Sequence, residues 1–169
     1  MSEQDRLRDL AHRWQEGFER SVIGQAVTGL DGRFIEVNPA NERVLGYTQA
    51  DFAGKTATEA GVWLSEADRE HYASTLRREG RLVGYETRMR HKDGHWVWIN
   101  TRGRVHRRDE QDRALFMSGT HLDISDRVAA QEQIRALNAS LEQRVQERTA
   151  ELERSMRDME AISYSIAHD

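Results

Sequence analysis

The spacing of apolar residues changes twice along the chain, and the two changes mark three regions. Residues 5–21 are predicted to form an amphipathic helix, because apolar side chains recur there at three- and four-residue intervals among Arg, Glu and Gln. Its apolar face consists of Leu7, Leu10, Trp14 and Phe18. From residue 24 to residue 123 the apolar positions form short runs bounded by turn residues, which is typical of strands and short helices.

The middle region is predicted to hold two strands, several short helices and three further strands. Helix starts are indicated by residues that cap N-termini, and helix ends by glycines that tolerate a left-handed backbone. The N-caps are Asn38, Thr48 and Ser65, and the terminating glycines are Gly46, Gly54 and Gly80. The strands are expected at 25–29, 34–38, 83–91, 95–105 and 114–123. This order predicts an α+β fold, a five-stranded antiparallel sheet with helices on one face.

The last region is predicted to be one long helix from about residue 126 to residue 167, since it holds neither Pro nor Gly. Its apolar stripe is Ile134, Leu137, Leu141, Val145, Leu152, Met156, Met159, Ile162 and Ile166. The intervals from Ile134 to Val145 and on to Met156 sum to eleven-residue steps, which favour a coiled coil with stutters over a strict heptad. We therefore predict a parallel two-stranded coiled coil. The alternative is a solvated single helix held by charge pairs, which would leave the stripe in water.

Composition and charge exclude several classes of function. A net charge of −4 argues against nucleic acid as the main partner. No apolar run approaches the roughly 18 residues of a membrane span, and the N-terminal residues do not resemble a signal peptide, so we expect a cytoplasmic protein. The absence of Cys excludes disulfides and thiolate chemistry. No phosphate-binding loop or catalytic pair is evident, and no metal site is predicted.

Four short motifs in this order resemble the PAS sensor family. They are Asn38-Pro39-Ala40, Leu45-Gly46-Tyr47, Lys92-Asp93-Gly94 followed by Trp96-Val97-Trp98, and the segment from Asp123 to Arg127. The resemblance covers about residues 14–127. It implies that the last strand is coupled to the exit helix through Asp123, Ile124, Ser125 and Arg127. The family usually has Thr where this chain has Ser125, and the hydroxyl is kept.

A PAS-like fold implies a pocket between sheet and helices. Its expected lining is Phe34, Val44, Leu45, Phe52, Trp63, Tyr72, Leu76, Phe116 and Met117, although each of these residues would suit an ordinary core. The flavin photochemistry of the family needs a reactive Cys, which is absent here. Haem would need an axial histidine, for which only His71 is plausibly placed, and we do not expect it. No cofactor is predicted. His91 and His95 flank the Asp93-Gly94 turn and could meet across the hairpin, although exposed turn histidines are the commoner case.

The chain ends in Ser-Tyr-Ser-Ile-Ala-His-Asp, which resembles the start of the phosphoacceptor helix of sensor histidine kinases. The resemblance implies that His168 accepts a phosphoryl group from ATP, and that Asp169 orients and activates it. The ATP-binding domain is absent, so the chain alone should not phosphorylate itself. Alone, a His-Asp pair at a helix end would be an ordinary exposed pair.

Four segments follow from these assignments: an N-terminal helix over 1–21, a PAS domain over 22–125, a coiled coil over 126–160, and the start of the phosphoacceptor helix over 161–169. We predict the sensory and dimerisation portion of a two-component histidine kinase, homodimeric through the N-terminal helix and the coiled coil, with a response regulator as partner of the full-length kinase. Two alternatives remain. One is a PAS and coiled-coil module that dimerises another output, such as a cyclic-dinucleotide enzyme; the other is a ligand-binding photo- or redox sensor.

Overall fold

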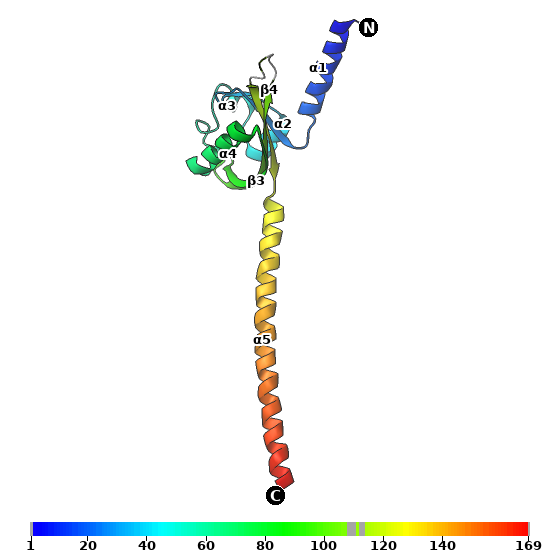
Figure 1. Cartoon of the computed structure of the whole chain (residues 1–169), viewed down its shortest axis with the longest axis vertical. Helices are drawn as coiled ribbons and strands as arrows, with labels where there is room; N and C mark the ends of the chain where they lie inside the picture. Colours follow the sequence, from blue (N-terminus) through cyan, green and yellow to red (C-terminus); the bar gives the residue numbers. More distant parts are fainter. Residues whose placement is uncertain (1, 108–110, 112–113, 169) are drawn as a thin grey trace. The chain divides into compact units, whose positions relative to one another are not determined.

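The computed structural model describes residues 2–107, 111 and 114–168, without the side chains of Arg107, Ala114 and His168. Two compact units divide the chain, Met1–Ser125 and Asp126–Asp169. The first unit contains the sheet and all but one of the helices in Figure 1. The second consists of the long helix that follows the sheet.

The elements occur in the predicted order and differ from the predicted ranges only at their ends. The first unit contains α1 (Glu3–Glu19), β1 (Gly24–Thr28), β2 (Phe34–Val37), α2 (Pro39–Leu45), α3 (Gln49–Phe52), α4 (Glu66–Glu79), β3 (Arg81–Arg90), β4 (Trp96–Arg107) and β5 (Ala114–Asp123). Helix α5 (Ser125–His168) begins at the end of this unit and makes up the second.

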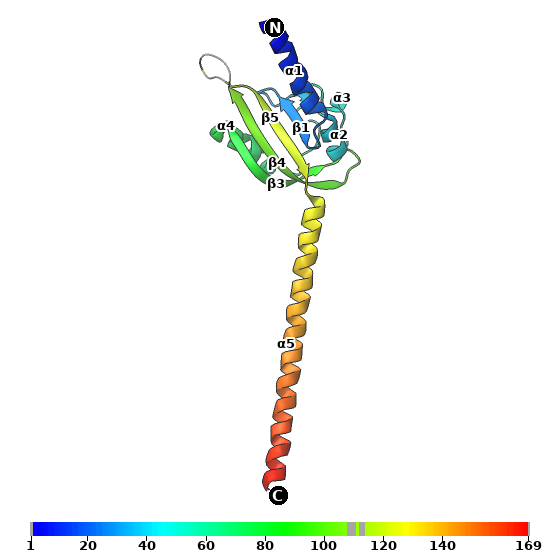
Figure 2. The ribbon, with the colours of Figure 1, turned by 90° about the vertical axis from the view of Figure 1, so that its right-hand side faces the viewer.

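The five strands form one sheet in the order β2-β1-β5-β4-β3, and every neighbouring pair is antiparallel. Figure 2 shows β1, β5, β4 and β3 side by side. Helices α2, α3 and α4 pack against these strands, so the predicted α+β fold is confirmed. The first and last strands of the unit become neighbours in the middle of the sheet. Residues from both ends of the domain therefore meet on its inner face.

Local hydrogen bonds explain why the short helices begin and end where they do. The side chain of Asn38 accepts a hydrogen bond from the backbone N–H of Asn41, and Thr48 forms a reciprocal capping box with Asp51. Gly46 and Gly80 end α2 and α4 in the left-handed conformation, at φ of 76° and 71°. A side chain at either position would be strained, because L-residues other than Gly rarely adopt that backbone.

The core lies on the inner face of the sheet. Along β4, Val97, Ile99 and Thr101 are buried, whereas Trp98 and Asn100 between them are only partly buried. Because successive side chains of a strand point to opposite faces, the alternation along β4 identifies the inner, buried face of the sheet. Val97 and Ile99 belong to one hydrophobic cluster with Ala26, Leu45, Phe52, Val62 and Met89.

Two helices leave their apolar residues uncovered within a single chain. On α1 only Phe18 is buried, whereas Leu7, Leu10 and Trp14 are exposed. Asn38 holds the end of this helix by donating a hydrogen bond from its amide to the carbonyl of Phe18. The large apolar residues of the α5 stripe are all exposed. No helix is both long and apolar enough to cross a bilayer within residues 2–107, 111 and 114–168.

Candidate functional site

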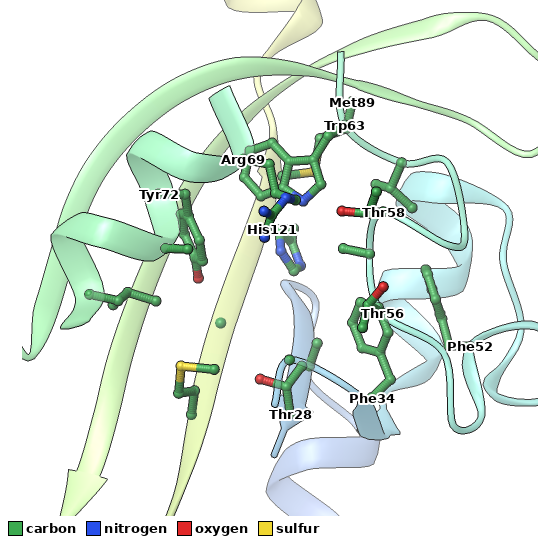
Figure 3. A pocket seen from close by; sticks show the side chains of 18 of the residues that line it. Thr28, Phe34, Phe52, Thr56, Thr58, Trp63, Arg69, Tyr72, Met89 and His121 are labelled. Carbon is green, nitrogen blue, oxygen red and sulfur yellow. The ribbon is translucent and has the colours of Figure 1, made fainter. Parts of the chain in front are cut away.

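A cavity of about 470 Å³ lies between the inner face of the sheet and the helices. Its floor comes from β1 and β5, one wall comes from α4, and the opposite wall comes from Phe34, Phe52 and the segment 56–63 (Figure 3). Because β1 and β5 are neighbours only in the folded sheet, the cavity is assembled from residues nearly a hundred positions apart.

Seven of the nine residues expected to line a pocket lie around this cavity: Phe34, Leu45, Phe52, Trp63, Tyr72, Leu76 and Met117. The structure places the other two elsewhere. Val44 packs against the core cluster beside the cavity, because it lies one position from Leu45 on α2 and points in another direction. Phe116 stacks on His106, its cross-strand partner on the outer face, with ring centroids 4.5 Å apart. Since Met117 faces inward, the adjacent Phe116 faces outward.

Aromatic rings form much of the apolar surface of the cavity. Phe34 and Phe52 lie 4.3 Å apart between ring centroids, and Trp63 of the segment 56–63 lies 5.3 Å from Tyr72 of α4. Both pairs are tilted, an arrangement that aromatic rings prefer over direct face-to-face stacking. The walls therefore offer flat apolar contact surfaces on two sides.

His121 also lines the cavity, although it was not among the residues expected there. It lies on β5, and its Nδ1 is 3.0 Å from the side-chain oxygen of Asn41 on α2. An amide oxygen only accepts hydrogen bonds, so Nδ1 carries the proton and Nε2 is left as an acceptor. Burial lowers the pKa of His121 to about 4, so the ring is neutral at neutral pH. His121 lies four residues after Met117 on β5, so strand alternation places both side chains on the inner face.

Tyr72 presents a second neutral polar group, and two glycines make room for it. A Cβ atom at Gly103 would lie 2.5 Å from the Tyr72 hydroxyl oxygen, and one at Gly119 would lie 3.3 Å from it. Gly103 and Gly119 are cross-strand partners on the inner face of β4 and β5. Burial raises the pKa of Tyr72 to about 12, so the phenol keeps its proton.

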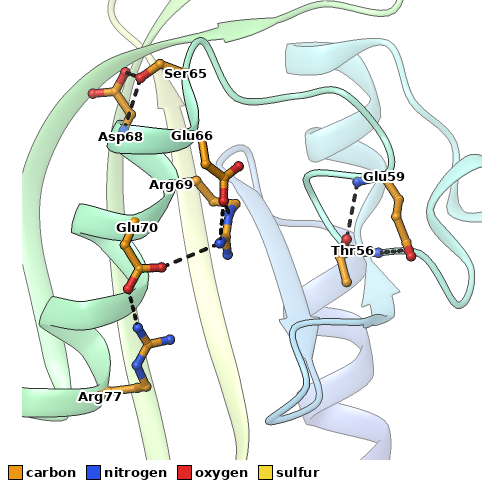
Figure 4. Close-up of polar contacts among 8 residues, drawn as sticks. All are labelled: Thr56, Glu59, Ser65, Glu66, Asp68, Arg69, Glu70 and Arg77. Atoms are coloured by element: carbon orange, nitrogen blue, oxygen red, sulfur yellow. Dashed lines mark hydrogen bonds and ion pairs between the residues drawn. The ribbon is translucent and has the colours of Figure 1, made fainter.

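Charged side chains near the cavity are paired with each other (Figure 4). Arg69 forms ion pairs with Glu66 at 2.6 Å and with Glu70 at 3.5 Å, and Glu70 also pairs with Arg77. On the opposite wall, Glu59 accepts a hydrogen bond from the backbone N–H of Thr56. Because two carboxylates offset Arg69, the cavity is better suited to a neutral molecule than to an anion.

His71, considered above as an axial ligand for haem, is on the exposed side of α4. Its ring lies 5.0 Å from the ring of Tyr85, and it is not among the residues that line the cavity. A haem iron in this cavity would therefore have no bond to His71.

Two hydrogen bonds join the junction between β5 and α5 to β4, and a third lies within the junction. The backbone N–H of Ile124 donates to the carbonyl of Trp98 at 2.8 Å, and the N–H of Trp98 donates to the hydroxyl of Ser125 at 3.1 Å. The Asp123 carboxylate accepts from the N–H of Ser125 at 2.8 Å, which satisfies an N–H at the start of α5. Ile124 is buried. Further along, Arg127 donates to Gln131 within α5.

One polar residue, Thr149, interrupts the apolar stripe of α5. Thr149 occupies the stripe position between Val145 and Leu152, and its hydroxyl donates to the carbonyl of Val145 at 2.8 Å. The hydroxyl is thus satisfied within its own helix, so the position adds no unpaired donor to the stripe. Helix α5 continues to His168. The side chain of His168 and the whole of Asp169 lie outside the described residues.

Comparison with known proteins gives consistent matches. A sequence model of the PAS fold matches residues 34–121. Over 134 residues, 78% of this chain, the sequence is 27% identical to the sensor histidine kinase TmoS of Ectopseudomonas mendocina, of whose length this chain spans 14%. A PAS domain from Colwellia psychrerythraea is similar with a TM-score of 0.62 at 26% identity, covering 70% of this chain and 99% of that one. A domain of a sensory box sensor histidine kinase/response regulator from Geobacter sulfurreducens has a TM-score of 0.56 at 21% identity, covering 69% and 96%.

Proposed function

The chain belongs to the PAS fold family, and from that premise we propose that it is the sensory and dimerisation portion of a cytoplasmic two-component sensor histidine kinase. The observation that carries this proposal is helix α5, which runs from the PAS domain to His168 with an exposed apolar stripe. The similarity to the sensor histidine kinase TmoS supports it.

A second copy of this chain is the proposed partner of the α5 stripe. Leu137 and Leu141 are each 61% exposed and Val145 is 56% exposed, which is more apolar surface than a stable lone helix keeps in water. In a parallel coiled coil the same residues of two chains would face each other and be buried together. The exposed face of α1, with Leu10 and Trp14, is proposed to extend this dimer.

Dimerisation through the stripe predicts a specific effect of charge. Leu141→Asp would bury a carboxylate at the helix interface and should weaken the dimer by at least tenfold, roughly the effect of 1.4 kcal/mol. Gln143→Asp introduces the same charge two positions away, on another side of the helix, and should leave association intact. Sedimentation equilibrium of both variants beside the parent measures the change. Equal dimer strength in all three proteins would exclude this interface.

The proposed output is transfer of the γ-phosphoryl group of ATP to a ring nitrogen of His168. The nitrogen lone pair forms the new N–P bond while the bond from phosphorus to the bridging oxygen breaks, and ADP leaves. Asp169 would accept a hydrogen bond from the other ring nitrogen, which holds the tautomer and orients the attacking one. The phosphoryl group would then pass to a response regulator. The ATP-binding domain would be supplied by the rest of the kinase, so this chain alone is expected to be inactive.

The proposed input is a small neutral molecule in the cavity. Aromatic walls from Phe34, Phe52, Trp63 and Tyr72 suit a flat apolar body. The Nε2 acceptor of His121 suits a hydroxyl or N–H donor on the ligand. A change in the strands around the ligand would reach α5 through the hydrogen bonds between Trp98 and the junction.

The test of the output uses the chain extended through its natural downstream sequence. The extended protein is incubated with labelled ATP beside a His168→Ala variant, and acid-labile phosphate is scored. Label in the parent and none in the variant is the expected result. An unlabelled parent, or equal labelling of both proteins, would contradict the role of His168. The chain would then be better explained as a PAS and coiled-coil module that dimerises a different output domain.

A further inference from the structure

The turn between β3 and β4 brings three side chains with metal-binding atoms into one cluster. Nδ1 of His91 lies 3.0 Å from Oδ1 of Asp93, and Nδ1 of His95 lies 2.5 Å from the same oxygen. One ligand atom from each of the three residues lies within 4.8 Å of the other two. The three residues are spaced as His-x-Asp-x-His, so a single hairpin supplies the whole cluster.

The backbone of the turn holds these residues in place. The N–H of His91 donates to the carbonyl of His95 at 2.9 Å, and the N–H of His95 donates to Oδ1 of Asp93 at 3.1 Å. Gly94, at φ of 102°, allows the tight return of the chain between them. The two imidazole rings stack with centroids 4.4 Å apart. Both imidazoles are therefore positioned by the hydrogen-bonded turn between β3 and β4.

The turn is also fixed to the helices of the domain. Lys92 donates its backbone N–H to the carbonyl of Leu45 at 2.9 Å, and its ammonium group pairs with Asp51 at 2.7 Å. His91 packs against the end of α2, where a Cβ atom at Gly46 would lie 2.5 Å from its ring. The absence of a side chain at Gly46 thus makes room for His91, which is half-buried.

We propose that His91, Asp93 and His95 form a binding site for a divalent transition-metal ion such as Zn²⁺. Two imidazoles and one carboxylate are a ligand set that zinc accepts, with a fourth position left for water. Adjacent ligand atoms of a tetrahedral zinc site are about 3.3 Å apart, given bonds of about 2.0 Å. The two separations from Asp93, 3.0 Å and 2.5 Å, are shorter than this by less than about 1 Å.

The nature of the ligands selects among ions. Mg²⁺ and Ca²⁺ prefer six or more oxygen ligands, and the cluster offers one carboxylate and two nitrogens. Bound zinc would join the end of β3 to the start of β4 and stabilise the hairpin that Lys92 attaches to α2 and α3. The site does not involve the cavity, α5 or His168, and it stands independently of the proposed kinase function.

The experiment is a calorimetric titration of the untagged full chain with Zn²⁺, repeated with Mg²⁺. We expect one zinc ion per chain, no comparable binding of Mg²⁺, and a higher melting temperature with zinc. Asp93→Asn keeps an oxygen to accept the turn hydrogen bond but removes the charge, and His95→Ala removes an exposed ligand. Each should weaken zinc binding by at least about tenfold and abolish the rise in melting temperature.

Two matched controls separate this site from general histidine binding. His12→Ala removes an exposed histidine on α1, and His168→Ala removes the histidine at the end of α5. Both variants should bind zinc like the parent. Melting curves without metal verify that all variants are folded. No zinc binding by the parent, or unchanged affinity in both Asp93→Asn and His95→Ala, would overturn the proposal and leave a hydrogen-bonded turn only.

Discussion

Inside the cavity, His121 and Tyr72 face the same interior and are both held in their neutral forms. Burial acts in opposite directions on the two groups, lowering the pKa of His121 to about 4 and raising that of Tyr72 to about 12. In each case the low-polarity surroundings disfavour the charged form. The cavity therefore presents hydrogen-bonding groups without net charge over the whole physiological pH range.

The low pKa of His121 predicts a pH-dependent stability. The unfolded chain binds a proton at His121 below about pH 6.5, whereas the folded protein binds it only near pH 4. The free energy of unfolding should therefore fall as the pH drops from about 6.5 towards 4, by roughly 1 to 2 kcal/mol at pH 5. Above pH 7 this contribution should be constant. Urea unfolding at several pH values measures it.

His121→Gln is the control for that pH dependence. The Gln amide can still donate to the side-chain oxygen of Asn41 but does not titrate. We expect the variant to lose the fall in stability between about pH 6.5 and pH 5 that the parent shows. An identical pH profile in parent and variant would mean that another group causes the effect.

At the scale of elements, three consecutive residues at the junction after β5 each make a different contact. Asp123 accepts the first N–H of α5, Ile124 fills the core, and Ser125 accepts from Trp98 of β4. The strand and the helix are thus joined without a flexible loop between them. A displacement of β4 at Trp98 would act directly on the residue where α5 begins.

Ser125→Ala tests the hydrogen bond that joins this junction to β4. It would leave the half-buried N–H of Trp98 without its acceptor, which should lower the free energy of unfolding by about 1 to 3 kcal/mol. Ser125→Thr keeps a hydroxyl and should retain most of the stability. Chemical denaturation gives the free energies, and hydrogen exchange at the Trp98 amide should be faster in the Ala variant alone. Equal exchange in the two variants would show that the hydroxyl is not the acceptor in solution.

At the scale of the whole molecule, the two compact units have different sources of stability. The first unit has its own core, whereas the second is the helix α5, whose large apolar residues are exposed in a single chain. Helix propensity and charge pairs stabilise a lone helix only weakly. The stability of α5 therefore depends on burial of its apolar stripe against a partner. Signal transfer along α5, as proposed, would therefore be a property of the dimer.

The relay predicts that the angular phase of α5 controls output. Deletion of Ala130 would rotate the stripe by about 100° relative to the residues before it, and should lock or abolish phosphorylation of the response regulator by the full-length kinase. Deletion of residues 128–134 shortens α5 by seven residues but changes the phase by only about 20°. Signalling should survive that longer deletion. Normal signalling after loss of Ala130 alone would contradict the relay.

Much of the fold could be predicted because its signals are local. Asn38-Pro39 begins a helix, Gly80 ends one, and Asp93-Gly94 turns a hairpin, each through contacts with its own neighbours in the chain. The long helix followed from an uninterrupted run of helix-forming residues. The four motifs that resemble the PAS family agreed with that order. Element types were therefore fixed before any long-range contact was known.

The cavity was predictable only in part. Most of the expected lining residues surround it, but Phe116 was assigned to the same interior as Met117 although neighbours on a strand face opposite ways. His121 was passed over because its partner Asn41 lies 80 positions earlier in the chain. Strict use of strand alternation would have excluded Phe116 and favoured His121.

The sequence by itself determined the helices, the strands, their order and the apolar stripe of α5, since caps, turns and periodicity act over a few residues. Only the tertiary structure decided that β1 lies beside β5, that Gly103 and Gly119 leave space for Tyr72, and that His91 and His95 share one oxygen of Asp93. The reason is physical. Distances between side chains depend on sheet register and packing, which many weak contacts throughout the domain set together.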